Sequence, residues 1–117
     1  MLNQTCIFCK IIEKTIPSTI IQENDNVIVI QDRAPKAPTH YLIIPKKHIE
    51  TVTAITPADS LYSEALLEMA QTLGNTLPSK AFNLIINNGA AAGQSVFHLH
   101  MHFLAGKNLY DESGIRL

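Results

Sequence analysis

The feature that most constrains this 117-residue chain is a stretch near its C-terminal end, residues 98–103, in which three histidines alternate with three large apolar residues. A β-strand points successive side chains to opposite faces, so the alternation predicts a strand with Leu99, Met101 and Phe103 in a core. The three histidines would then share the other face, whereas a helix would scatter them around its circumference. A histidine-rich tract can be no more than a metal site. Imidazole is also the side chain most readily used as a base or nucleophile near neutral pH, and we favour a working site.

Composition limits the class of protein. The chain is long enough for one domain, 1–117, and its 46% hydrophobic and 16% charged residues indicate a packed globule. A net charge of −1 argues against nucleic acid as a partner. No apolar run is long enough to cross a bilayer, and the start of the chain lacks the pattern of a signal peptide. We therefore expect a cytoplasmic protein with no membrane partner.

The order of elements predicts the fold class. Apolar spacing indicates a short helix over residues 5–14 and a long helix over residues 56–77, and no regular structure is expected in the tail, 105–117. Runs rich in β-branched residues, bounded by turn residues or proline, predict five strands. The expected strands cover residues 20–23, 27–31, 40–45, 82–87 and 98–104. Short connections favour antiparallel pairing, so we expect an α+β domain with a single five-stranded antiparallel sheet.

Two cysteines, Cys6 and Cys9, have the C-x-x-C spacing. In a chain without an export signal this spacing favours reduced thiols used for metal binding or redox chemistry over a structural disulfide. A structural zinc needs four ligands, so two histidines would have to complete the set. The alternative is that each cysteine is a small buried apolar residue.

The residues around the histidines suit phosphate chemistry. Three adjacent imidazoles cannot all be protonated cheaply, so at least one should stay neutral near pH 7 and act as a nucleophile toward phosphorus. Ser95 and the backbone N–H groups after Gly93 could hold phosphate oxygens. Asp32, at a strand end, could accept hydrogen bonds from ribose hydroxyls, although a turn-capping aspartate explains it equally well.

Several ordered blocks, together covering most of residues 6–104, match a known pattern. The segment His98-Leu-His100-Met-His102-Phe resembles the signature of the histidine triad family. Further blocks resemble the nucleotide-binding, or purine nucleoside phosphoramidase, branch of that family. They are Ile7-Phe8 through Ile21, Asp32-x-x-Pro35-x-Ala37-Pro38-Thr39-His40, Ile44-Pro45-Lys46-Lys47-His48-Ile49, Asn87-x-Gly89 and Gly93-Gln94-Ser95-Val96.

The resemblance implies a reaction. It implies hydrolysis of nucleoside 5′-phosphoramidates, or of acyl- or aminoacyl-nucleotides, to the nucleoside monophosphate. By position, His100 would attack the α-phosphorus to give a nucleotidyl-histidine, and His102 would bind a phosphate oxygen. His98 would complete the triad, His40 would orient it, and Ser95 would lie near the leaving amine. Family members need no metal for this chemistry.

The resemblance also implies binding residues and partners. Asp32 would hold the ribose of a purine nucleotide, with Asn87 and Gln94 on the phosphate side. The base pocket would be bordered by Ile7, Phe8 and Ile11, which ordinary core packing explains almost as well. Some members bind a structural zinc through residues that correspond to Cys6, Cys9, His48 and His98. A homodimer joined through the long helix and the fourth strand is implied as well.

Two positions depart from the family pattern. The branch usually ends in a tail that carries tryptophan, and this chain has no tryptophan; Asn88 stands where an acid is common. Both changes leave the nucleophile untouched and the leaving-group preference open. Two alternatives therefore stand: a dinucleotide polyphosphate hydrolase, and a zinc-stabilised nucleotide-binding module with little turnover.

Overall fold

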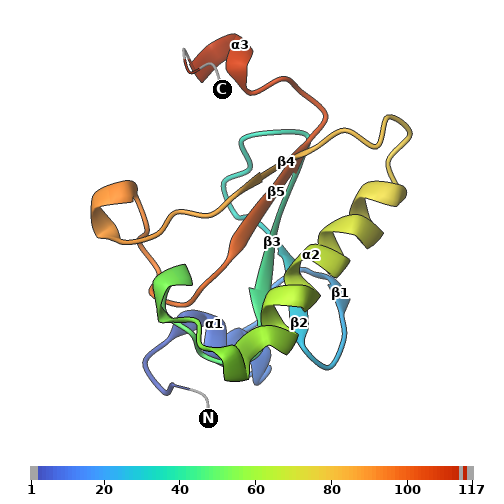
Figure 1. Ribbon diagram of the computed structural model, residues 1–117. Helices are drawn as coiled ribbons and strands as arrows, with labels where there is room; N and C mark the ends of the chain where they lie inside the picture. Colours follow the sequence, from blue (N-terminus) through green and yellow to red (C-terminus); the bar gives the residue numbers. More distant parts are fainter. Residues whose placement is uncertain (1–2, 114, 116–117) are drawn as a thin grey trace.

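The computed structural model describes residues 3–113 and 115, and its elements follow the order expected from the sequence (Figure 1). Short one-turn 3-10 helices lie between β3 and α2 and again between β4 and β5. The helices and strands are α1 (Ile7–Ile12), β1 (Ile20–Glu23), β2 (Val27–Gln31), β3 (Thr39–Pro45), α2 (Ser60–Asn75), β4 (Asn83–Ile85), β5 (Met101–Ala105) and α3 (Tyr110–Ser113).

The five strands form one antiparallel sheet in the order β1-β2-β3-β5-β4. The register between β3 and β5 places Ile43 opposite Met101 and Leu42 opposite His102. Strand β4 pairs with β5 and lies at the edge of the sheet. The predicted fold, α+β with a single five-stranded antiparallel sheet, is confirmed.

The sheet has an apolar cluster on each face. Alternate residues of β2 separate cleanly: Val27 and Val29 pack toward α2, while Ile28 and Ile30 pack toward α1. On β5, Met101 and Phe103 join the α2 side, so the intervening His102 faces the α1 side. Figure 1 shows α2 lying across one side of the sheet and α1 near one end of it. The paired strands β3 and β5 carry His40 and His102 on this α1 face.

The predicted histidine strand is shorter than expected, because β5 begins only at Met101. Its neighbour β3 ends at Pro45, which has no N–H to continue the ladder. The Leu99 N–H instead donates to the Ile49 carbonyl at 2.6 Å. The alternation itself survives, since Leu99 is 2% exposed in the α2-side cluster.

Three other boundaries differ from expectation. Helix α2 begins at Ser60, after a 3-10 turn in which the Thr56 N–H donates to the Asp59 carboxylate at 3.0 Å. Strand β4 is limited to three residues. The expectation of no regular structure in the tail is wrong, because the Asn108 side chain accepts from the Tyr110 N–H and starts α3. Among the described residues, no helix is long and apolar enough to cross a membrane.

Candidate active site and metal centre

The histidines come from three places on the α1 face of the sheet. His40 lies on β3 and His102 on β5, and their ring centroids are 5.1 Å apart. His98 and His100 precede β5, and the centroid of the His100 ring lies 5.3 Å from that of His102. The sheet thus brings residues 62 positions apart in the chain into one cluster.

His100 is held with one nitrogen free. Its Nδ1–H donates to the carbonyl oxygen of His98 at 2.8 Å, so the lone pair of a neutral ring lies on Nε2. Burial lowers the pKa of His100, which keeps the ring neutral near pH 7. The Phe8 ring meets it edge-on at 5.0 Å between centroids. A neutral, oriented imidazole with an unbonded nitrogen is the form required of a nucleophile.

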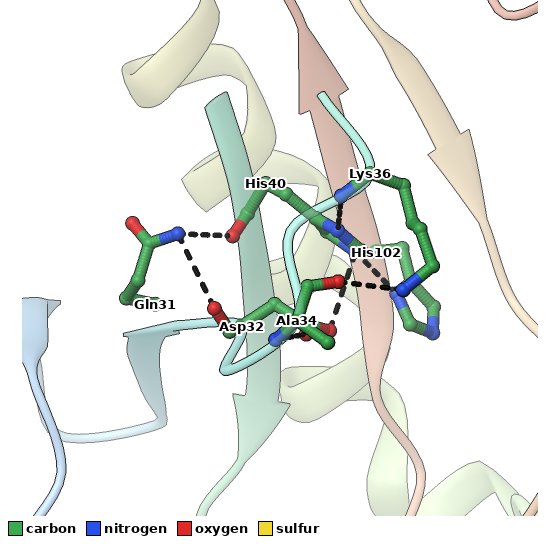
Figure 2. Close-up of polar contacts among 6 residues, drawn as sticks. All are labelled: Gln31, Asp32, Ala34, Lys36, His40 and His102. Carbon is green, nitrogen blue, oxygen red and sulfur yellow. Dashed lines mark hydrogen bonds and ion pairs between the residues drawn. The ribbon is translucent and has the colours of Figure 1, made fainter. Parts of the chain in front are cut away.

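His40 and His102 form a hydrogen-bonded pair (Figure 2). The backbone N–H of Lys36 donates to His40 Nδ1 at 3.0 Å, so the one proton of neutral His40 must lie on Nε2. That Nε2–H lies 2.9 Å from His102 Nδ1 and 3.4 Å from Asp32 Oδ2. His102 Nδ1 is therefore an acceptor, and His102 carries its own proton on Nε2 as a donor for a ligand.

Electrostatics keep this pair neutral. Burial, with the charges of His100 and His40 adding to it, lowers the pKa of His102 to about 4. Burial also lowers the pKa of His40, which is 4% exposed. Since both rings are neutral near pH 7, the tautomers given by the hydrogen bonds are the ones present.

A second cluster gathers Cys6, Cys9, His48 and His98, whose ligand atoms all lie within 4.8 Å of one another. Cys6 Sγ lies 3.3 Å from His98 Nδ1, Cys9 Sγ lies 3.2 Å from His48 Nδ1, and the two Nδ1 atoms are 3.2 Å apart. Tetrahedral zinc with bonds of ~2.0–2.3 Å separates its ligand atoms by roughly 3.3–3.8 Å. The sulfur and nitrogen donors fit zinc in both kind and spacing.

The ring of His98 belongs to this metal cluster. It is 0% exposed, and its Nε2–H donates to the Pro45 carbonyl at 2.8 Å, which turns the Nδ1 lone pair toward the cysteines. The ring has no nitrogen left for a substrate, so the three histidines do not share one role. What His98 gives the cluster of His40, His100 and His102 is its backbone carbonyl.

The thiol of Cys9 supports the same interpretation. It is fully buried, and burial raises its pKa, so without a cation it would stay a neutral thiol. The Asn3 N–H nevertheless points at its sulfur at 3.3 Å, as donors do toward a metal-bound thiolate. A bound cation would supply the charge that this environment lacks.

The loop before the histidines is organised by Gln94. Its buried amide donates to the Glu50 and Val96 carbonyls at 2.8 and 3.0 Å, and its oxygen accepts from the Gly89 N–H at 2.7 Å. With both donors and its oxygen used, Gln94 shapes the loop, and a contact with phosphate stays a prediction. Ser95 is exposed in this loop beside the metal cluster.

The residues predicted to border the base pocket divide into two kinds. Phe8 and Ile11 are 6% and 4% exposed and belong to the α1-side core, which agrees with the alternative that they are ordinary core residues. Ile7 is 38% exposed and free to meet a ligand. Phe8 also packs edge-on against His98 and His100, so its ring borders the catalytic cluster.

A cavity of about 690 Å³ opens beside the His40–His102 pair. Asn87 lies in its wall, as do residues of β4 and of the tail. Its lining includes Lys36, Asn83, Leu84, Ile85, Lys107, Leu109 and Tyr110. The tail, for which the sequence predicted no structure, thus forms one wall of a space next to the histidine cluster.

Sequence reasoning missed the groups that fix the tautomers. These are the Lys36 N–H, the Pro45 carbonyl and the His98 carbonyl, which contact the rings of His40, His98 and His100 respectively. All three are backbone groups, which nearly every residue type offers alike, so no motif marks them.

The sheet, the oriented histidine cluster and the adjoining Cys/His centre define a protein of the histidine triad class. The HIT domain family model matches residues 13–109, and the chain belongs to that family. An uncharacterized HIT-like protein of Synechocystis sp. is 43% identical over 107 residues, which cover 91% of this chain and 94% of the relative.

Solved structures agree with the family assignment. A HIT family hydrolase from Clostridium thermocellum superposes with a TM-score of 0.86 at 42% identity, over 92% of this chain and 95% of that one. A Zn-bound histidine triad family protein from Mycobacterium smegmatis gives a TM-score of 0.74 at 32% identity, over 90% of this chain and 77% of that one.

Proposed function

We propose that this protein is a nucleotide hydrolase that cleaves the P–N or P–O bond at the α-phosphate of nucleoside 5′-phosphoramidates or acyl- and aminoacyl-nucleotides. The observation that carries the proposal is the hydrogen bond from His100 Nδ1–H to the His98 carbonyl, which leaves Nε2 of a neutral ring free. Similarity to HIT family hydrolases supports the hydrolytic outcome.

The reaction would proceed in two displacements. His100 Nε2 attacks the α-phosphorus, the bond to the leaving nitrogen breaks, and that nitrogen takes one proton from solvent water and departs as the neutral amine. The His102 Nε2–H donates to a phosphate oxygen and stabilises the charge that develops there. Water then attacks the same phosphorus, releases one proton to the solvent, and displaces the neutral His100 ring as the nucleoside monophosphate forms.

Binding of a purine nucleotide would use the residues beside the catalytic cluster. Asp32, whose side chain is 19% exposed, would accept hydrogen bonds from the ribose hydroxyls. Ile7 and Phe8 on α1 would border the base, while Asn87 and Ser95 would lie toward the phosphate and the leaving group. Each of these roles rests on position in the family pattern, and Phe8, Asp32 and Asn87 also lie beside the histidine cluster.

Zinc would be structural in this protein. Bound to Cys6, Cys9, His48 and His98, it would supply a cross-link between the start of α1, the loop after β3 and the segment before β5. The Zn-bound relative from Mycobacterium smegmatis supports this assignment. Metal binding requires reduced thiols, which suits a cytoplasmic protein. None of the residues that would contact the phosphate belongs to the metal set.

A homodimer would cover the exposed apolar side chains of α2 and β4. Leu67 on α2 is 62% exposed, and Leu84 and Ile85 on β4 are 36% and 40% exposed. Strand β4 is also an edge strand, which can pair with a second copy. Sedimentation of the wild type beside Leu84→Lys should show a dimer that the charge converts to monomer.

The cavity beside His102 favours a second candidate, a dinucleotide polyphosphate hydrolase. Two lysines, Lys36 and Lys107, lie in its lining with the aromatic ring of Tyr110, and no acidic side chain appears among its described lining residues. A cationic and aromatic wall suits an anionic leaving group that carries a second base. Comparing turnover of diadenosine polyphosphate with that of an adenosine phosphoramidate separates the two candidates.

The test of the proposed function is hydrolysis of adenosine 5′-phosphoramidate by the wild type and by His100→Ala, each with and without a chelator. We expect turnover to be lost in the variant, to survive chelation, and to pass through an adenylyl-enzyme seen by mass spectrometry after an alkaline quench. His100→Gln, which approximates the ring in size, should bind the monophosphate as the wild type does and should not turn over.

Two results would contradict the proposal. If the wild type binds adenosine monophosphate but releases no amine, the protein is a binding module. If His100→Ala keeps a rate within threefold of the wild type, the nucleophile has been assigned wrongly.

A further inference from the structure

The Asp32 carboxylate is engaged within the protein in a way that ribose binding does not explain. One oxygen, Oδ1, accepts from the Ala34 N–H at 2.8 Å, and the other, Oδ2, lies 3.4 Å from His40 Nε2 (Figure 2). The His40 side chain is only 5% exposed, so this contact is sheltered from water. Asp32 therefore faces His40 and, through it, the His40–His102 pair.

His40 has a single proton to place. The Lys36 N–H donates to Nδ1, which favours the proton on Nε2, where Asp32 Oδ2 and His102 Nδ1 are both within reach. A carboxylate beside an N–H favours the tautomer in which that nitrogen keeps its proton. In turn, His102 Nδ1 accepts and His102 Nε2 keeps the proton that would face the phosphate.

We propose that Asp32 is a positioning residue as well as a ribose ligand: through His40 Nε2–H its carboxylate fixes the tautomer of His102 that donates to the phosphate. The inference rests on the proposed function, because the donor matters only if a phosphate is transferred. It is consistent with the charges at the site, since burial lowers the pKa of His40 and His102 while the Asp32 charge acts in the opposite direction on both.

Asparagine separates the two roles of Asp32. Its side chain has one oxygen where aspartate has two, so it cannot accept from both the Ala34 N–H and the His40 Nε2–H. If the oxygen stays with Ala34, the amide NH₂ faces His40 Nε2–H, donor against donor. The opposite tautomer of His40 is not available without loss, because Nδ1 would then face the Lys36 N–H with a proton.

The experiment compares two substrates on two enzymes. Wild type and Asp32→Asn are assayed on adenosine 5′-phosphoramidate and on its 2′,3′-dideoxy analogue, which has no hydroxyls for Asp32 to hold. We expect Asp32→Asn to lower kcat on both substrates by about 10- to 100-fold. This loss is smaller than the one expected from removing the His102 ring, which would donate to the phosphate directly. An added rise in KM should appear only with the ribose substrate.

The kcat of Asp32→Asn on the dideoxy substrate decides whether Asp32 has the positioning role. If Asp32→Asn turns over the dideoxy substrate with the kcat of the wild type, Asp32 is a sugar ligand only. Asp32→Glu should recover kcat in part. Asp25→Asn, which removes one negative charge from an exposed position in the turn before β2, should change neither parameter.

A spectroscopic arm keeps this inference distinct from the proposed function. Imidazole ¹⁵N spectra should show His40 and His102 protonated at Nε2 in the wild type, and a shift of His40 away from that tautomer in Asp32→Asn with unchanged circular dichroism. If the wild type shows no turnover, the proposed function fails. The ¹⁵N spectra would still test whether Asp32 fixes the tautomers of His40 and His102. Unchanged imidazole spectra in Asp32→Asn would overturn the coupling even in an active enzyme.

Discussion

His98 and His100 are joined through the backbone of one and the ring of the other. His100 Nδ1–H donates to the carbonyl oxygen of His98 at 2.8 Å, while the His98 ring turns away to the Cys/His cluster. His98 therefore links the centre that would hold zinc, through its ring, to the candidate nucleophile His100, through its carbonyl. Anything that moves His98 alters the acceptor that orients His100.

Metal removal is predicted to lower stability more than it alters the chemistry. The four donors come from the start of α1, the loop after β3 and the segment before β5, so the ion would cross-link parts of the chain far apart in sequence. We expect Cys9→Ser, or the wild type with a chelator, to melt at least about 10 °C below the loaded protein. Differential scanning calorimetry with metal analysis measures this.

The matched control for metal removal is His100→Ala, which leaves all four donors in place and should keep one metal ion per chain. A Cys9→Ser protein that melts with the wild type would show that the cluster holds no stabilising ion.

Stability should depend on pH through His102. Burial lowers the pKa of His102 from 6.5 in the unfolded chain to about 4 in the fold, so the unfolded chain binds more protons between these values. The sign follows from linkage: the contribution is fully present above about pH 6.5 and is lost as the pH falls toward 4. Urea unfolding at a series of pH values measures the slope.

His102→Asn provides the comparison for the pH dependence, because asparagine does not titrate. The variant should lose less stability than the wild type between pH 6.5 and pH 4. Parallel curves would mean that His102 titrates normally in the fold.

A residue larger than glycine at Gly74 on α2 is predicted to lower the free energy of unfolding. A Cβ at this position would lie 2.3 Å from Cε2 of Phe82, and the Phe82 ring is stacked on Phe103 at 4.7 Å between centroids. Because moving the ring would break its stacking on Phe103, Gly74→Ala should destabilise the protein by about 1–3 kcal/mol, although alanine favours a helix. Denaturant unfolding gives the value.

A second substitution identifies the clash at Gly74. Phe82→Leu should remove part of the cost of Gly74→Ala in a double-mutant cycle, whereas exposed Asn75→Ala should be nearly neutral. An additive cycle would place the strain elsewhere.

Asp59 is predicted to fix the start of α2. Its carboxylate is 3% exposed, accepts from the Thr56 N–H and hydroxyl at 3.0 and 3.2 Å, and is paired with Lys47. Asp59→Ala should cost about 1–2 kcal/mol, the range for losing a capping group. Glu68→Ala, at an exposed site on the same helix, should change the unfolding free energy by less than about 0.5 kcal/mol. Equal losses in the two variants would contradict the capping role.

Much of the architecture was predictable because local patterns coincide with the final environment. The alternation around Met101 and Phe103 matches the two faces of β5, and the four-residue spacing that includes Ala65, Met69 and Leu73 matches the buried side of α2. Boundaries were less predictable. Strand β5 begins late because Pro45, on another strand, ends the ladder, and α3 depends on a single side-chain cap at Asn108.

The sequence by itself determined which side chains were available: histidines on one face, a cysteine pair one helical turn apart, and an aspartate at a strand end. Only the tertiary structure decided how the histidines divide their roles. His98 goes to the metal cluster, His100 keeps a free nitrogen, and His40 directs His102. The physical reason is that the partners that fix these tautomers are mainly peptide groups of Pro45, His98 and Lys36. Every residue carries such groups, so only folding selects which of them meets each ring.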